Sequence, residues 1–229
     1  MKISYCVTCS SETTTLEHLL SQISSVLGDD ELIILQDKSH FIPFNKTYEI
    51  ILKAVMNDNI PIENIYHFTH PLNNDYGQFK NEFIKKSTGD YIMAIDGDEM
   101  LPESLVGENL HALIENNPTI EAYAIPRIND FRGVTEEHAK QWGWRLTTST
   151  TFNRPIVNFP DYQWRLFKNI PSIRFQRKLH EKIEGYKKYS FLPAEEEWAL
   201  YHDKTIETQI TTNLRYNSQF TREENMGIQ

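Results

Sequence analysis

The stretch 89-GDYIMAIDGDEML-101 decides how the fold is interpreted, because it joins an apolar segment directly to a group of acids. Tyr91 to Ile95 has the pattern of a buried strand, and Asp96, Asp98 and Glu99 follow it at once. Carboxylates placed this close together repel one another, and each loses hydration at the edge of a core. The sequence therefore predicts that positive charge meets these acids.

Upstream of this stretch, strand patterns alternate with helix patterns. Strands are predicted at 2–7, 31–37, 64–69 and 91–95, and helices within 13–28, 44–58 and 73–89. Gly28 and Gly89 are the predicted stops of the first and third helices. This alternation predicts an α/β fold with a mixed, mainly parallel sheet that is flanked by helices on both faces.

The second half of the chain is less regular. The pattern predicts a helix from Pro102 to about Pro118, a strand over 120–126, an irregular stretch from Asn129 to Phe159, strands within 162–168 and 173–183, and a closing amphipathic helix over 207–220. A long irregular stretch in a compact domain is usually functional or mobile. The 229 residues suffice for one large domain, which we divide into halves, 1–101 and 102–229.

Three polar residues fall at the ends of predicted strands. They are Thr8, Asp37 and Asp96, and in parallel sheets ligands bind at the carboxyl ends of the strands. A D-x-D motif leaving a buried strand offers the hard oxygen ligands that suit Mg²⁺ or Mn²⁺, and Gly97 between the acids lets the backbone approach a ligand. A solvated turn is the alternative interpretation of the motif.

Composition narrows the classes of protein. The formal net charge of −9 argues against a partner held by its phosphates, so nucleic acid is not expected, although a local basic groove is compatible with it. Cys6 and Cys9 have no second pair to complete a zinc site and fit a reducing compartment. With neither a signal peptide pattern nor a long apolar run, we expect a cytoplasmic protein without stable membrane insertion.

Three segments carry a family resemblance: 2-KISYCVTCSSETTTLEHLLSQI-23, 31-ELIILQDKS-39 and 73-NNDYGQFKNEFIKKSTGDYIMAIDGDEML-101. They resemble the glycosyltransferases of the GT-A (Rossmann-like) fold, in particular the inverting family 2, over most of the chain. The later pattern WRLFKN…RKLHEKIEG…LYHD resembles a subgroup with a His-Glu pair and a late His. The chain departs from the family where Thr8, Ser11 and Lys80 replace the common Pro, Asn and Arg.

The resemblance implies a donor and a place for it. The donor is a nucleoside diphosphate sugar, with a UDP-sugar expected; residues 1–101 bind it and residues 102–229 bind the acceptor. The implied donor-binding residues are Thr8 and Glu12 beside the nucleoside, Asp37 on the base, Asp96 on the ribose or metal, and Lys80 near the phosphates. Asp98 would bind Mn²⁺ or Mg²⁺, which neutralises the leaving diphosphate. His180 and His202 are additional candidate metal or phosphate ligands.

An inverting transfer also requires a general base for the acceptor hydroxyl. The candidates are Glu181 in LHEKI and Asp161 in NFPDYQW, and the subgroup's His-Glu pair favours Glu181. A surface glutamate paired with Lys178 or Lys182 is the structural alternative for Glu181.

Two other functions fit parts of the pattern. A haloacid-dehalogenase-type phosphatase also ends a strand in D-x-D, but it requires Thr or Val where Met100 stands. A non-catalytic nucleotide-sugar-binding module would keep the fold without turnover. For a transferase, the acceptor is open: a glycan, a lipid-linked sugar, a protein or a modified base. Four aromatic residues are candidates for stacking on a sugar acceptor, with core packing as the alternative: Trp142, Trp144, Tyr162 and Trp164.

Overall fold

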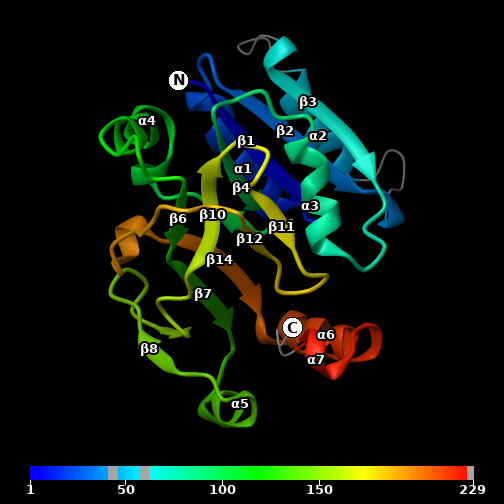
Figure 1. The fold of residues 1–229 in the computed structure, drawn as a ribbon. Coiled ribbons are helices and arrows are strands. Elements are labelled where there is room, and N and C mark those ends of the chain that lie inside the picture. The colour runs from blue at the N-terminus through cyan, green and yellow to red at the C-terminus, as the bar shows by residue number, and fades with distance from the viewer. Residues whose placement is uncertain (41–45, 57–61, 226–229) are drawn as a thin grey trace.

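The computed structural model describes residues 1–40, 46–56 and 62–225. Within these ranges the largest sheet has seven strands in the order β13-β6-β10-β4-β1-β2-β3 (Figure 1). The strands are β1 (Ile3–Cys9), β2 (Glu31–Asp37), β3 (Ile65–His70), β4 (Tyr91–Asp96), β6 (Ala122–Ile125), β10 (Gln163–Lys168) and β13 (Tyr189–Phe191). Neighbours pair in parallel except around β10, which is antiparallel to β4 and β6. The predicted mixed, mainly parallel α/β sheet is confirmed.

Helices cover both faces of this sheet, as the alternation predicts. One face carries α1 (Thr14–Val26), α2 (Lys46–Val55) and α4 (Gly107–Glu115), and the other carries α3 (Tyr76–Ile84) with the hairpin β11 (Arg174–Gln176) and β12 (Lys182–Glu184). The buried leucine stripe of α1 contributes on the order of 2 kcal/mol per side chain. Cys6 and Cys9 are both buried, and they pack into the clusters on opposite faces because their spacing in a strand is odd.

A second sheet of five described strands has the order β5-β14-β7-β9-β8. Its strands are β5 (Glu99–Met100), β14 (Leu200–Thr205), β7 (Arg127–Arg132), β9 (Pro155–Val157) and β8 (Leu146–Thr148). Strands β7, β8 and β9, together with α5 (Glu136–Trp142), occupy much of the stretch that was predicted to be irregular, so that prediction is wrong. The pattern was hidden because β7 buries polar residues, Asn129 and Asp130, which have polar partners.

Two helix predictions also need correction. The helix predicted from Pro102 is divided into a short 3₁₀ helix, η3 (Glu103–Leu105), and α4, because Val106 is extended and the Gly107 N–H donates to the Tyr5 hydroxyl at 3.1 Å. Helix α3 ends at Ile84 instead of Gly89. The Gly89 N–H donates instead to the Ser4 hydroxyl on β1.

The C-terminal helices α6 (Ile206–Gln219) and α7 (Arg222–Asn225) lie at the edge of the molecule (Figure 1). Among the apolar residues of this segment, Ile206 and Phe220 are buried, whereas Leu214 is 65% exposed. The apolar side of α6 is therefore buried only near the two ends of the helix. Over the ranges that the structure describes, none of the helices combines the length and apolar composition needed to cross a membrane.

Candidate active site

The ends of β1 and β4 bring Thr8 and Asp96 together. These residues are register partners in the parallel ladder, and the Thr8 hydroxyl donates to Asp96 Oδ1 at 2.7 Å. The turn after β4 lies against β1, where the Gly97 N–H donates to the Thr8 carbonyl oxygen at 2.7 Å. A Cβ at Gly97 would lie 3.1 Å from that oxygen and from Cys9 Cβ, so glycine permits this close approach.

Asp96 is held by two buried cations. Lys80 Nζ, on α3, lies 2.7 Å from Asp96 Oδ1, and an Arg165 terminal nitrogen, on β10, contacts Asp96 Oδ2. Burial alone would raise the pKa of Asp96, but the charges of Arg165 and Lys80 outweigh it and lower the pKa below its usual range. The positive charge expected at this strand end is thus supplied in part by the protein itself.

Asp98 lies beside His202 because β5 pairs with β14. His202 is the register partner of Glu99, and its Nε2 lies 3.3 Å from Asp98 Oδ2, while Lys204 Nζ lies 2.8 Å from the same oxygen. Burial raises the pKa of Asp98, but His202 and Lys204 lower it well below its ordinary value. Burial lowers the pKa of His202, which favours the neutral imidazole. His202 lies within β14.

Glu181 is joined to Asp96 through Lys80. Glu181 Oε1 lies 2.6 Å from Lys80 Nζ, whose other carboxylate partner is Asp96. Lys80 is buried, and the Glu181 side chain is 15% exposed. Helix α3 can approach the chain before Glu181 because Gly77 has no side chain there; a Cβ would lie 2.5 Å from the Arg177 carbonyl oxygen. The two predicted residues Lys80 and Glu181 are therefore in direct contact.

Asp161 belongs to a separate part of the polar network. One of its carboxylate oxygens accepts from Arg127 at 2.7 Å and from Asn129 at 2.8 Å, and the other accepts from Gln163 at 3.0 Å. Burial raises the pKa of Asp161, but Arg127 and Asn129 lower it. Asn129 also contacts His202 Nδ1 through its side-chain oxygen at 2.9 Å, which links Asp161 to the residues around Asp98.

Glu12 lies in the loop that follows β1, and Asp37 is the last residue of β2. The Glu12 carboxylate accepts from the Ser10 N–H at 2.5 Å, and burial raises its pKa, with Asp98 and Asp96 adding to that effect. Asp37 Oδ1 accepts from the Ser39 and Leu72 N–H groups at 2.9 and 3.0 Å. Because Thr8, Asp37 and Asp96 end adjacent parallel strands, they line the same sheet edge.

His180 and the two tryptophans of 142–144 lie apart from these contacts. His180 is exposed, and its Nε2 lies 2.8 Å from the Asn225 carbonyl oxygen. Trp142 and Trp144 pack on each other with ring centroids 4.6 Å apart. Trp164 follows Gln163 on β10 and packs with Phe191, which in turn contacts Tyr162. The structure thus places Trp164 on the strand that carries Arg165 and Tyr162 directly before that strand, whereas Trp142 ends α5.

Sequence reasoning missed the two arginines that hold the acids together. Arg165 lies 2.7 Å and Arg127 lies 3.0 Å from Glu99 Oε1, and Glu99 is fully buried. The available signal was a charged residue inside an otherwise apolar strand, as in YQWRLFK, since a buried arginine requires a carboxylate partner. Lys204, which contacts Asp98, and Asn129, which contacts Asp161, were missed as well.

The side chains around Asp98 include possible ligands of a divalent ion. In the part of the chain that the structure describes, no group of three or more His, Cys, Asp or Glu side chains is arranged to hold a metal. Asp98 and His202 nevertheless present a carboxylate oxygen and a neutral imidazole nitrogen 3.3 Å apart. Two such donors fit a Mn²⁺ or Mg²⁺ ion whose remaining positions are filled by oxygens of a bound molecule.

Comparisons with known proteins concern the fold and the family of the chain. No curated protein matches the chain. Among solved structures, S. aureus TarS is similar with a TM-score of 0.57 and 15% identity, over 96% of this chain and 41% of TarS. Its fragment 1–349 is similar with a TM-score of 0.57 and 14% identity, over 100% of this chain and 69% of the fragment. The chain thus spans about two fifths of the TarS chain, and identities this low show a shared fold alone.

The family comparison reaches further than the fold. Residues 6–183 match Glycosyl transferase family 2, a range that runs from β1 into β12. It includes the acids after β4, Lys80 on α3 and Glu181. Since the match covers well over half of the sequence and takes in these contacts, the chain belongs to Glycosyl transferase family 2.

Proposed function

We propose that this glycosyltransferase is metal-dependent and inverting, and that it moves a sugar from a nucleoside diphosphate sugar, most simply a UDP-sugar, to an acceptor hydroxyl. The observation that carries the proposal is the Asp98–His202 pair, 3.3 Å apart at the carboxyl end of β4. It offers two metal donors beside four cations, Lys80, Arg127, Arg165 and Lys204, that are held by the neighbouring acids.

Residues 1–101 are proposed to bind the donor. Asp37 and Glu12 would face the base and the nucleoside, with Thr8 beside them, and the Thr8–Asp96 contact would lie at the ribose. Lys80 would face the phosphates. The common sheet edge of Thr8, Asp37 and Asp96 supports this assignment.

Asp98 and His202 are proposed to hold Mn²⁺ or Mg²⁺. When bound, the ion would act as a Lewis acid and neutralise charge on the leaving diphosphate. Lys204, 2.8 Å from Asp98 Oδ2, would place a further cation beside the phosphate oxygens. His180 would need to leave its contact with Asn225 to become a further ligand.

Glu181 is proposed as the general base that accepts the proton of the attacking hydroxyl. Glu181 Oε1 has a fixed position, 2.6 Å from Lys80 Nζ. Lys80 also contacts Asp96, so one residue separates Glu181 from Asp96 in this chain of contacts. Asp161 is less suited, because both of its oxygens accept hydrogen bonds from Arg127, Asn129 and Gln163. Residues 102–229, which carry Glu181, would supply the acceptor side.

The acceptor class is open between a glycan, a lipid-linked sugar, a protein and a modified base. Family membership removes the phosphatase alternative, and Asp96 would in any case be a poor nucleophile with both oxygens engaged. A non-catalytic module that binds the donor without turnover is the alternative to test, and sustained release of UDP separates the two functions.

The test is a thermal-shift titration with UDP-GlcNAc, with which S. aureus TarS 1–349 has been crystallised, in the presence and absence of Mn²⁺. A ligand that binds the folded state raises Tm by mass action. We expect a shift with UDP-GlcNAc that grows with Mn²⁺, and Asp98→Asn should remove the Mn²⁺-dependent part. Asp29→Asn, an exposed aspartate in the turn before β2, is the matched control. A full Mn²⁺-dependent shift in Asp98→Asn would contradict the metal assignment.

A further inference from the structure

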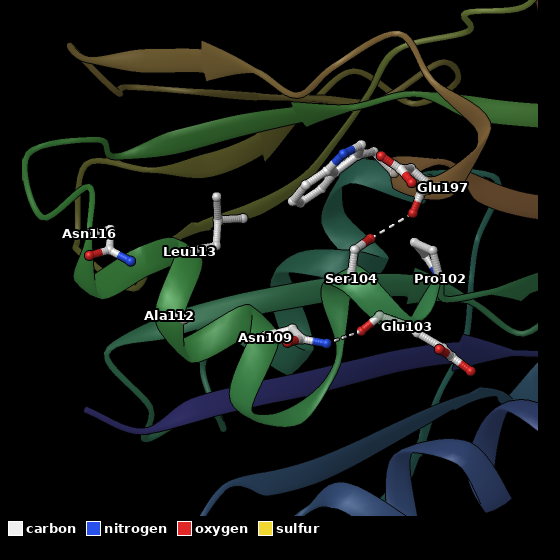
Figure 2. A pocket seen from close by; sticks show the side chains of 9 residues that line it. Pro102, Glu103, Ser104, Asn109, Ala112, Leu113, Asn116 and Glu197 are labelled. Atoms are coloured by element: carbon white, nitrogen blue, oxygen red, sulfur yellow. Dashed lines mark hydrogen bonds between the residues drawn. The ribbon is translucent and has the colours of Figure 1, made fainter.

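A pocket of ≈ 730 Å³ lies beside the paired strands β5 and β14, at the end where β5 finishes and β14 begins. Asp98 lies at the opposite end of this pair. Nine residues line it: Pro102, Glu103, Ser104, Asn109, Ala112, Leu113, Asn116, Glu197 and Trp198 (Figure 2). They come from η3, α4 and η4 (Glu196–Trp198) or directly flank these helices, and none of them takes part in the contacts around Asp96 and Asp98. A volume of this size is typical of small-molecule sites, which lie roughly between 300 and 1,000 Å³.

The pocket is built onto the same strands as the candidate metal donors. Glu103 follows Glu99 of β5 by four positions, and Trp198 precedes β14, which carries His202. At most about 14 Å of chain therefore separates Glu99 from Glu103. The two walls are joined where the Ser104 hydroxyl donates to the Glu197 carbonyl oxygen at 2.7 Å, as Figure 2 shows.

The lining combines one aromatic ring with several exposed polar side chains. Trp198 is half-buried and packs against the core cluster, with Leu113 and Pro102 in the same lining. Glu103, Asn116 and Glu197 are exposed, so their polar side chains are accessible to a bound molecule. Figure 2 shows the Asn109 amide donating to the Glu103 carbonyl oxygen, at 2.9 Å.

These groups select a chemical class of ligand. None of the nine lining residues is cationic, and two are carboxylates, so an anion is disfavoured there. A sugar ring offers an apolar C–H face, which suits the electron-rich face of an indole, and hydroxyls around its rim, which suit amides and carboxylates. We propose that this pocket binds an uncharged saccharide, as a second saccharide site remote from the transfer centre. This goes beyond the proposed donor chemistry and does not depend on it.

The test is saturation-transfer NMR with three probes, maltotriose, cellotriose and N-acetylchitotriose, each at millimolar concentration. We expect at least one to bind, and Ala112→Arg to weaken that binding about tenfold or more by filling the pocket. Ala112 is an exposed helix position, so the change should leave the fold intact. Glu115→Arg, exposed on α4 but outside the lining, should leave binding unchanged.

Two further measurements keep this site separate from the donor site. Asp98→Asn should still bind the saccharide, and glucose 6-phosphate should not compete for the pocket. Failure of all three probes to bind wild-type protein would overturn the inference, as would unchanged affinity in both Ala112→Arg and Trp198→Ala. Loss of saccharide binding in Asp98→Asn would also overturn it, because the signal would then come from the transfer site.

Discussion

At the residue scale, Glu181 and Asp161 are both carboxylates of the polar network, but only Glu181 is joined through a single lysine to Asp96. Glu181→Gln keeps the size of the side chain and removes its capacity to accept a proton. We expect this change to reduce UDP release from UDP-GlcNAc by about 10²-fold or more while leaving UDP binding intact. Steady-state kinetics and a UDP titration measure the two effects. The control is Glu184→Gln, which is exposed on the same hairpin, and wild-type turnover in Glu181→Gln would refute the assignment.

Arg165 allows buried and exposed ion pairs to be compared in one protein. It is buried with Glu99 and contacts Asp96, whereas Arg132 makes a half-exposed pair with Asp203. Arg165→Met leaves carboxylates inside the protein with fewer cations, so the free energy of unfolding should fall by roughly 3–5 kcal/mol. Arg132→Met should change it by about 1 kcal/mol or less. Urea denaturation of both variants checks this, and equal effects would show that the Arg165 contacts are not retained in solution.

The same residues show how far the sequence could predict the site. Asp96 and Asp98 were predictable because they directly follow an apolar run, and local order is visible in sequence. Arg165, the partner of Asp96 and Glu99, was not, because its position depends on β10 inserting antiparallel beside β4, about seventy positions along the chain. Glu181 was assigned by family resemblance, and its contact with Lys80 became visible only when α3 and the hairpin were placed on the same face.

At the element scale, Glu31 ties the start of β2 to β1 and to the loop before β4. Its carboxylate accepts from the Ser4 hydroxyl and from the N–H and hydroxyl of Thr88, each at 2.6 Å, and Lys2 Nζ lies 2.9 Å away. Burial would raise the pKa of Glu31, but these hydrogen bonds lower it from 4.5 to about 2. The folded protein thus binds fewer protons than the unfolded chain between these pH values, and stability falls as pH drops through this window.

Glu31→Gln tests this junction. We expect the variant to lose roughly 2 kcal/mol of stability at pH 7, and the difference from wild type to shrink as pH falls from about 4.5 toward 2. Urea denaturation at a series of pH values measures it. Glu63→Gln, at an exposed glutamate before β3, should match wild type throughout. A difference between wild type and Glu31→Gln that stays constant down to pH 2 would contradict the pH dependence.

The elements also show where periodicity succeeds and where it fails. The strands and helices before Asp96 were predictable, since most of them bury a continuous or striped apolar surface in the core, although β3 buries only Ile65. Strand β7 was not, because Asn129 and Asp130 face polar partners instead of the core. The break at Val106 was equally invisible, because it depends on a distant hydroxyl, that of Tyr5.

At the scale of the whole molecule, the site lies on the junction of the two sheets. Strand β4 ends at Asp96 in the seven-stranded sheet, and β5 begins at Glu99 in the five-stranded sheet described here. Asp98 falls in the turn between them, so the relative position of the sheets fixes the distance from Asp96 to the Asp98–His202 pair. The predicted halves 1–101 and 102–229 are interleaved in both sheets, with β6, β10 and β13 completing the first.

The C-terminal helices provide the last prediction, because they flank Glu181 and bury little. Helix α6 packs Tyr216 against Tyr76, with ring centroids 6.3 Å apart, and Glu224 pairs with Lys178 at 3.1 Å. Removing residues 208–229 keeps the buried Ile206 but removes the buried Phe220 and the Tyr216–Tyr76 contact, so we expect Tm to fall by several degrees with the fold retained. The loop before Glu181 loses its cover, and we expect UDP release to fall about tenfold or more while UDP binding persists. Leu214→Glu, on the exposed face of α6, should change neither property. Equal turnover in the truncated and full chains would show that Glu181 is held by Lys80 and the hairpin alone.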